Sequence, residues 1–400
     1  MAGATSSAVS PNGGVAAGLQ QPQTTIEPPG GPFIRHSQPG RRPIYNTSGL
    51  SFLASGNIVT QPVVAVPGYF RGFRMTLTSS GGTAGTGQTL NPDYPYSIAS
   101  LVTLKDAFGT PIIVAPGYEA FNLIPLYGGQ LGIQGTRFVS NLPSYSASTG
   151  ATSTGNFSFS TYLPFEFAKA YGCISGANAS LLPTLTMNIA NSAALTSGGT
   201  AFSGNALQVQ CDADFYWLPE GVAVEPPGLG TTMQWIYQQC NPTFSNGSTT
   251  TVQLPRLGGY IAALILEIRD GGNGNARVDN WPTGSNRLRI IVDGVPLIDS
   301  TMAQIYDDMA IQFGIGDGSS ASGTVTRPTG TICITRRTSL NQTDMGLFDT
   351  GESYLSTNPG TLIEIQGSPW ASAGTGPYTL NVLAAQVVPA GTLIQGLPEV

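Results

Sequence analysis

Acidic side chains are the first candidates for chemistry in this 400-residue chain. Two carboxylates about 5 to 9.5 Å apart can hydrolyse glycosidic bonds. The candidates are Glu166, Glu220, Glu225, Glu267 and Glu364, of which Glu267 and Glu364 each interrupt an apolar segment. A single acid on the outer side of a strand is the ordinary pattern of a half-solvated sheet. We therefore interpret these acids as structural and expect no enzyme.

Histidine and cysteine offer little further chemistry. His36 is the only histidine, which argues against Ser-His-Asp and Cys-His nucleophilic sites. The cysteines are widely spaced and form no CxxC pair, which argues against zinc. They are Cys173, Cys211, Cys240 and Cys333. We expect buried free thiols, no metal and no cofactor.

Two other patterns have a functional and a structural interpretation. The segment RDGGNGNARVDNW (269 to 281) resembles a calcium-binding glycine-aspartate turn, but Asn275 stands where an aspartate is wanted, so a hairpin loop is favoured. The tryptophans are scattered along the chain, so packing is favoured over a carbohydrate-binding platform. They are Trp217, Trp235, Trp281 and Trp370.

A basic group lies in the polar N-terminal region. Residues 1 to 48 are rich in Pro, Gly, Gln and Ser and poor in periodic apolar positions, which predicts a flexible arm. Within it, FIRHSQPGRRP contains Arg35, His36, Arg41 and Arg42. These residues belong either to a solvated linker or to a docking site for an anionic surface such as lipid headgroups, where each basic residue contributes about 1 kcal/mol.

The composition favours a strand-rich protein with covered surfaces. The 52 glycines and 30 prolines predict many turns, and only 10% of residues are charged, well below the usual share of about 25%. We expect neighbouring molecules to cover much of this weakly charged surface. The net charge of −6 argues against sequence-specific nucleic-acid binding. The first residues lack the pattern of a signal peptide.

The chain repeats one order of segments, with separations that shrink from about 190 to about 170 residues. The matched strand segments are 66–82 with 256–272, 104–113 with 290–298, 157–167 with 330–340, 183–190 with 360–367, and 214–221 with 384–391. The strands predicted in the first copy are 58–66, 69–78, 98–104, 111–114, 157–167, 183–190 and 207–218. This pattern predicts two β-domains, 49–222 and 251–400, joined by a linker, 223–250.

One amphipathic helix is predicted within residues 294–314. Met302, Ile305, Tyr306, Met309 and Phe313 share a face, Asp299 or Ser300 could cap the start, and Gly314 could end it. In the first copy, Pro116 could open a shorter helical turn that Pro125 stops. The helix occupies the same place in both copies, so we expect it to belong to the fold.

These features together resemble the double jelly-roll major capsid proteins of tailless icosahedral viruses, the tectivirus and adenovirus lineage. GYFRGFRMTLT and YLPFEFAKAYG are similar to the framework strands of such coats. The resemblance implies two tandem eight-stranded jelly rolls, each with a short helix midway, and an extended N-terminal arm.

The resemblance also implies a function. It implies a pseudo-hexagonal homotrimer that contacts neighbouring trimers, penton and minor capsid proteins, and internal membrane lipids where a tailless phage has them. Such a protein is assembled in the host cytoplasm and resides in the virion shell. Segments 132–156 and 316–330 would be exposed loops. A trimeric receptor-binding spike, fibre or adhesin with two β-domains stays open as the alternative.

Overall fold

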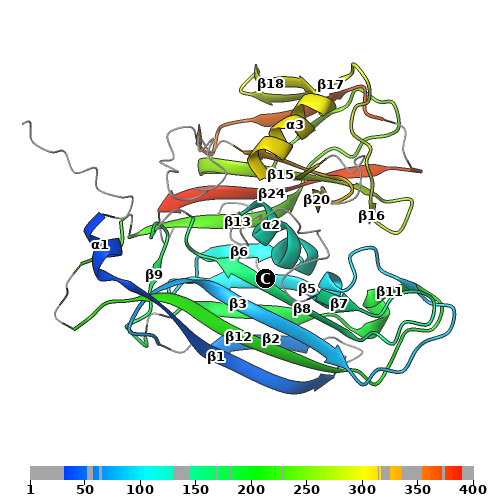
Figure 1. Cartoon of the computed structure of the whole chain (residues 1–400). Coiled ribbons are helices and arrows are strands. Elements are labelled where there is room, and N and C mark those ends of the chain that lie inside the picture. The colour runs from blue at the N-terminus through cyan, green and yellow to red at the C-terminus, as the bar shows by residue number, and fades with distance from the viewer. Residues whose placement is uncertain are drawn as a thin grey trace, which may run out of the picture.

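The chain forms two β-sandwiches stacked one on the other (Figure 1). The computed structural model describes residues 31–51, 57–62, 65–128, 145–167, 170–180, 182–220, 222, 224–227, 229–313, 315–316, 325–335, 354–371 and 374–389. We call the unit that ends at residue 217 jelly roll 1 and the unit that begins at residue 231 jelly roll 2. The first 30 residues of the predicted arm lie outside the described part, as do 132–144 and 317–324 of the two predicted loops.

Jelly roll 1 consists of two facing four-stranded layers. One layer, which we call the open sheet, has the order β1 (Gln38–Ser51), β12 (Ala206–Trp217), β3 (Gly68–Ser80), β8 (Phe157–Pro164), with the short β7 (Tyr145–Ala147) and β9 (Ile174–Ser175) at its margins. The other layer has the order β2 (Asn57–Pro62), β10 (Thr184–Ile189), β5 (Ala99–Lys105), β6 (Pro111–Ala115). In β3, Phe73, Met75 and Leu77 are buried while the residues between them are more exposed, which is the alternation of a sheet with one face on the core.

Jelly roll 2 repeats this strand order. Its first layer is β13 (Thr231–Gln239), β24 (Tyr378–Pro389), β15 (Gly259–Asp270), β21 (Thr331–Thr335), with β16 (Ala276–Arg277) and β22 (Leu355–Thr357) also paired to β15. Its second layer is β14 (Thr251–Gln253), β23 (Ile363–Ser368), β17 (Arg287–Val292), β18 (Val295–Thr301). The remaining described strands are the two short pairs β4 (Thr89–Leu90) with β11 (Thr196–Gly198) and β19 (Ile315–Gly316) with β20 (Val325–Thr326). The double jelly roll predicted from the sequence is therefore confirmed.

The two units also share their irregularities. The pairing of β12 with β3 skips Arg71, and the pairing of β24 with β15 skips Ala262 at the corresponding place. The hairpins β5–β6 and β17–β18 skip Ile112 and Leu297 respectively. A bulge shifts the register by one residue, so these shared bulges fix which residues of the two units correspond. In their described parts, all five matched strand segments of the sequence overlap corresponding strands.

The first strand of each unit differs from the sequence prediction. Residues 38–51 are not part of a flexible arm, because they form β1 and pair along β12. Their Pro, Gly and Arg content suits an edge strand, where a missing amide and a polar outer face are tolerated. Residues 231–239 are not a linker, because they form β13. β13 pairs with β24 on one side and runs parallel to β6 on the other, so the two units share a single ten-stranded sheet.

A helix follows the sixth strand of each unit. The predicted helix is α3 (Met302–Phe313), with Met302, Ile305, Met309 and Phe313 buried. Its cap is not Asp299 or Ser300, which belong to β18. Instead, the backbone N–H of Thr301 donates to the side-chain oxygen of Gln304, and the N–H of Gln304 lies 3.5 Å from the Thr301 hydroxyl oxygen.

The helical segment of jelly roll 1 runs from Pro116 to Tyr127. It consists of a wide turn at Glu119–Leu123, labelled η2, followed by α2 (Ile124–Tyr127). Pro125 does not stop it, because this proline lies in the first turn of α2, where no intrahelical amide bond is required. A third helix, α1 (Gly31–His36), precedes β1. No helix in the described ranges is both long and apolar enough to cross a bilayer.

One continuous core joins the sandwiches. Buried residues from both units belong to the same apolar cluster, including Trp235, Trp281 and Trp370. The packing role predicted for these three tryptophans is confirmed, whereas Trp217 is exposed. The segment 269–281 begins with the β15–β16 hairpin, as predicted, in which Asp270 accepts from the backbone N–H of Gly272.

Candidate functional site

The predicted acidic residues lie at separate places. Glu267 is buried between the two jelly rolls, Glu166 is buried at one end of jelly roll 1, and Glu364 lies on β23 beside Gln253. Glu220 and Glu225 are exposed on the segment that connects the units. Glu267 is nearly inaccessible to solvent. The buried acids therefore stabilise the fold through ion pairs and are not open to a substrate.

The strongest concentration of charge lies where the two jelly rolls meet. Arg269 on β15 forms ion pairs with Asp93 at 2.7 Å, with Glu119 at 2.8 Å, and with its strand neighbour Glu267. Arg277 on β16 binds Asp93 at 2.8 Å. We call Asp93, Tyr118, Glu119, Glu267, Arg269 and Arg277 the junction cluster.

Aromatic contacts complete the junction. The guanidinium carbon of Arg277 lies 3.8 Å from the centre of the Tyr118 ring, and one of its N–H groups donates to the Tyr118 hydroxyl. The rings of Tyr127 in α2 and Phe313 in α3 meet edge to face at 5.3 Å. The helical segment of jelly roll 1 therefore packs on jelly roll 2 through both ionic and apolar contacts.

Burial changes the protonation of this cluster. Desolvation raises the pKa of Glu267 to about 8, and the neighbouring Arg269 offsets only part of this effect. Desolvation also raises the pKa of Glu119. Three carboxylates face two guanidinium groups, so full ionisation would leave a net buried negative charge. Protonation of one of these buried glutamates makes the cluster neutral, which a buried site favours.

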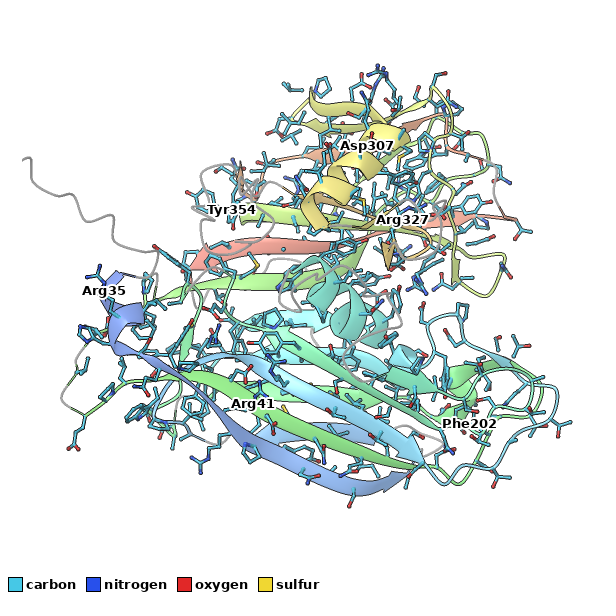
Figure 2. All side chains as sticks on the ribbon, viewed as in Figure 1. Arg35, Arg41, Phe202, Asp307, Arg327 and Tyr354 are labelled. Atoms are coloured by element: carbon cyan, nitrogen blue, oxygen red, sulfur yellow. The ribbon has the colours of Figure 1, made fainter. Side chains whose placement is uncertain are left out.

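The four basic residues of the predicted arm do not form one free patch. Arg35 and His36 are exposed on α1, whereas Arg41 and Arg42 belong to β1 (Figure 2). The Arg41 guanidinium donates to Asp214 at 2.7 Å, and Arg74 donates to the other oxygen of the same carboxylate at 2.8 Å. Arg42 donates to the carbonyl oxygen of Ala65. Arg41 therefore contributes to the pairing of the open sheet and is not an unpaired cation.

A second buried acid anchors α1. Glu166 accepts from Arg71 at 2.7 Å, from the Tyr216 hydroxyl at 2.8 Å and from the backbone N–H of Ala170 at 2.6 Å. Phe33 of α1 is buried against this site, with edge-to-face contacts to the rings of Tyr69 and Tyr216. The residues around Phe33 that precede β1 are therefore packed on jelly roll 1. In the sequence, the only signal for this contact is one aromatic residue among polar ones.

The outer face of the open sheet is a broad polar surface. By outer face we mean the side of a layer that points away from the core of its own jelly roll. Hydroxyl pairs join β3 to β8, Thr76 with Ser160 at 2.9 Å and Thr78 with Ser158 at 3.1 Å. A shallow groove of about 480 Å³ crosses this face, and its lining includes Arg41, Tyr45, Arg74, Thr76, Ser160 and Gln210. Hydroxyl and amide groups of this kind can form hydrogen bonds with another protein at a low desolvation cost.

The cysteines are free and buried, as predicted. Burial raises the pKa of the Cys173, Cys211 and Cys240 thiols, which keeps them protonated. Over the part of the chain that the structure describes, no three His, Cys, Asp or Glu side chains gather as metal ligands would.

Of the comparisons with known proteins, the one with solved structures identifies the fold. No family model matches the sequence. No curated protein matches it either. Among solved structures, the major capsid protein of Sulfolobus Turreted Icosahedral Virus superposes with a TM-score of 0.55 at 14% identity, covering 90% of this chain and 100% of that one.

A second solved structure, the major capsid protein P2 of bacteriophage PM2, gives a TM-score of 0.48 at 12% identity, covering 88% of this chain and 99% of that one. At these identities the likeness concerns the fold. This chain has the double jelly-roll fold of the Sulfolobus virus coat protein.

Proposed function

We propose that this protein is a major capsid protein that assembles as a homotrimer and tiles an icosahedral shell. The observation that carries the proposal is the pair of jelly rolls with the same strand order and the same bulges, in a fold shared with a viral coat protein. Three copies supply six similar units, so a threefold assembly can present nearly sixfold edges to its neighbours. The proposal assigns no catalysis.

Sparse charge supports repeated contact between copies. Only 10% of residues are charged, and the outer face of the open sheet is lined mainly by hydroxyl and amide groups. Copies with such surfaces repel one another weakly and lose little hydration when they meet. In the shell, trimers would contact other trimers laterally and penton and minor proteins at the vertices.

Light scattering tests the trimer. The purified protein is expected at three times its 41.5 kDa. Negative-stain images should then show hexagonal blocks, and rods or knobs would instead favour a spike or fibre. A species that stays monomeric at high concentration would contradict the coat assignment.

The α1 end of the molecule is proposed to face an anionic lipid surface inside the shell. Arg35 and His36 are exposed there, and Trp217, which is also exposed, pairs with Gln38 just after α1. Basic residues beside an exposed aromatic ring are a common combination at membrane interfaces. Arg41, which is held by Asp214, and Arg42, which donates to the Ala65 carbonyl oxygen, lie on β1 and are left out of this lipid contact.

Vesicle flotation tests the lipid contact. The protein should float with phosphatidylglycerol vesicles and not with phosphatidylcholine vesicles. The double variant Arg35→Ser, His36→Ser should lose this binding, while Arg289→Ser on jelly roll 2 should retain it. Equal binding by both variants would remove the lipid assignment without affecting the capsid role.

A further inference from the structure

The junction inside the chain is a template for a contact between copies. In the chain, β6 of jelly roll 1 runs beside β13 of jelly roll 2, with Ile113 opposite Trp235 and Val114 opposite Ile236. The helical segment that follows β6 then packs on jelly roll 2, where Glu119 binds Arg269 on β15. This junction therefore has two parts, a parallel strand pair and a helix laid on the outer face of a sheet.

The same two parts recur unpartnered on opposite sides of the molecule. Among the described strands, β18 corresponds to β6 and ends one sheet, while β1 corresponds to β13 and ends the open sheet. Figure 1 shows β18 at the top of the molecule and β1 at the bottom. β18 is unusually apolar for an edge strand, with Val295 60% and Leu297 40% exposed. Natural edge strands of this kind are normally covered.

The helix and the outer sheet face are also open. On α3, Ile311 is 56% exposed. Figure 2 shows Asp307 on α3 and Arg41 on the open sheet at opposite sides of the molecule. The groove of the open sheet lies beside β1, at the position where β15 receives the helical segment of jelly roll 1 in the internal junction.

From this correspondence we infer that β18 and α3 of one copy dock on β1 and the open sheet of the next copy, repeating the internal junction head to tail. The inference rests on the proposed capsid function and names the surfaces that would build its trimer. Each copy has one donor side and one acceptor side, and such a heterologous contact closes into a ring when the rotation fits.

Charge substitutions on the two sides agree with this docking. When the two units are aligned on Pro111 and Pro296, Gln304 of α3 corresponds to Glu119 of jelly roll 1. When β3 and β15 are aligned on their bulges at Arg71 and Ala262, Thr78 of β3 corresponds to Arg269 of β15. The ion pair of the internal junction is thus replaced on both sides by neutral polar groups. A change on one side alone would bury an unpaired charge, which is costly.

The strand register adds a second complementary pair. We transfer the register of the β6–β13 pair to β18 of one copy and β1 of the next, aligning the two units on their shared bulges. Ile298 then lies opposite Arg41, and Asp299 lies opposite Arg42. Asp299 is partly exposed and lies near Arg287 and Arg289 of its own copy. The Asp299 carboxylate would give Arg42 an acidic partner across the contact.

Paired cysteines test the contact in the full-length protein. The double variant Asp299→Cys, Arg42→Cys should form disulfides between copies under mild oxidation, because neighbouring strands lie about 4.8 Å apart. A non-reducing denaturing gel should show covalent dimers and trimers. Either single variant should stay monomeric on the gel, since a head-to-tail contact never brings two identical positions together.

A second pair reports the helix contact independently of the strands. Gln304→Cys with Thr78→Cys should cross-link to trimers with a short bis-maleimide, and Gln304→Cys with Glu220→Cys should not. Both substituted positions are at least partly exposed, so folding should be retained.

The outcomes separate this inference from the capsid proposal. Native trimers with no cross-link in either pair would overturn the docking surfaces and leave the capsid role standing. Single variants that cross-link as readily as the doubles would mean a twofold contact and would also overturn them. A protein that stays monomeric in solution would contradict both proposals.

Discussion

The outer faces of β3 and β15 occupy the same position in two units of the same topology, yet they carry opposite chemistry. On β15, Glu267 and Arg269 are buried in the junction cluster. At the corresponding positions of β3, Thr76 and Thr78 pair with serines on a partly exposed surface. The topology fixes the shape of this face, whereas the neighbour that covers it fixes its chemistry.

The difference follows from when each contact forms. The junction inside the chain forms once, during folding, and its ion pairs then stay buried away from water, where electrostatic interactions are strong. A surface that stays exposed until another molecule binds must keep the single copy soluble. It must also have a low desolvation free energy, and pairs of hydroxyl groups meet both requirements. Four predictions test this contrast, from the largest expected effect to the smallest.

Deleting residues 1–48 should prevent jelly roll 1 from folding, because it removes most of β1 and with it the partner of β12. Deleting residues 1–30 should leave the melting temperature unchanged, because every contact described above is retained. Circular dichroism and limited proteolysis of the two truncations provide the measurement. A stably folded 1–48 deletion would show that β1 is dispensable.

Arg269→Ala should destabilise the protein by about 3 to 5 kcal/mol, because it leaves buried carboxylates without their partner. Arg74→Ala on β3 should cost only about 0 to 1 kcal/mol, because Arg74 is 43% exposed in its side chain. Urea unfolding of both variants measures the difference. Equal losses would abolish the distinction between the buried and the open face.

The stability of the wild-type protein should fall as the pH rises from about 4.5 through about 8. The pKa of Glu267 is raised from 4.5 to about 8 by burial, so the folded state favours the protonated form. The stabilisation is complete below the pKa of the unfolded chain and is lost as Glu267 ionises in the folded protein. Melting temperatures from pH 5 to 9 should decline less in Glu267→Gln. Parallel profiles for both proteins would place the proton elsewhere.

Thr76→Val should change the free energy of unfolding by less than about 0.5 kcal/mol, as expected for a surface position. If the open sheet is a contact between copies, the same variant should weaken trimer association, because the Ser160 hydroxyl loses its partner at an interface. Differential scanning fluorimetry and dilution-dependent light scattering separate the two effects. A large loss of monomer stability would assign the hydroxyl pairs to folding.

Much of the architecture was predictable from the sequence because its signals are local. Alternating apolar residues identified β3, β8 and β10, the spacing of Met302, Ile305 and Met309 identified α3, and the ordered repeat indicated two similar units. The absence of a second histidine argued against nucleophilic catalysis without any coordinates. These features depend on periodicity and composition, which a chain carries whatever its tertiary contacts.

The tertiary structure decided what depends on partners distant in the sequence. The polar composition of residues 38–48 predicts part of an arm, because an edge strand is defined by its pairing with β12 and not by its own polarity. The sequence likewise predicts a linker at residues 223–250, although β13 within it is the strand that joins the two units. Glu267 reads as a surface acid until Asp93, Glu119 and Arg269 are brought around it. The local sequence pattern determined most of the strands and the helix α3, whereas long-range pairing determined the strands β1 and β13 and which faces are buried or remain open to another molecule.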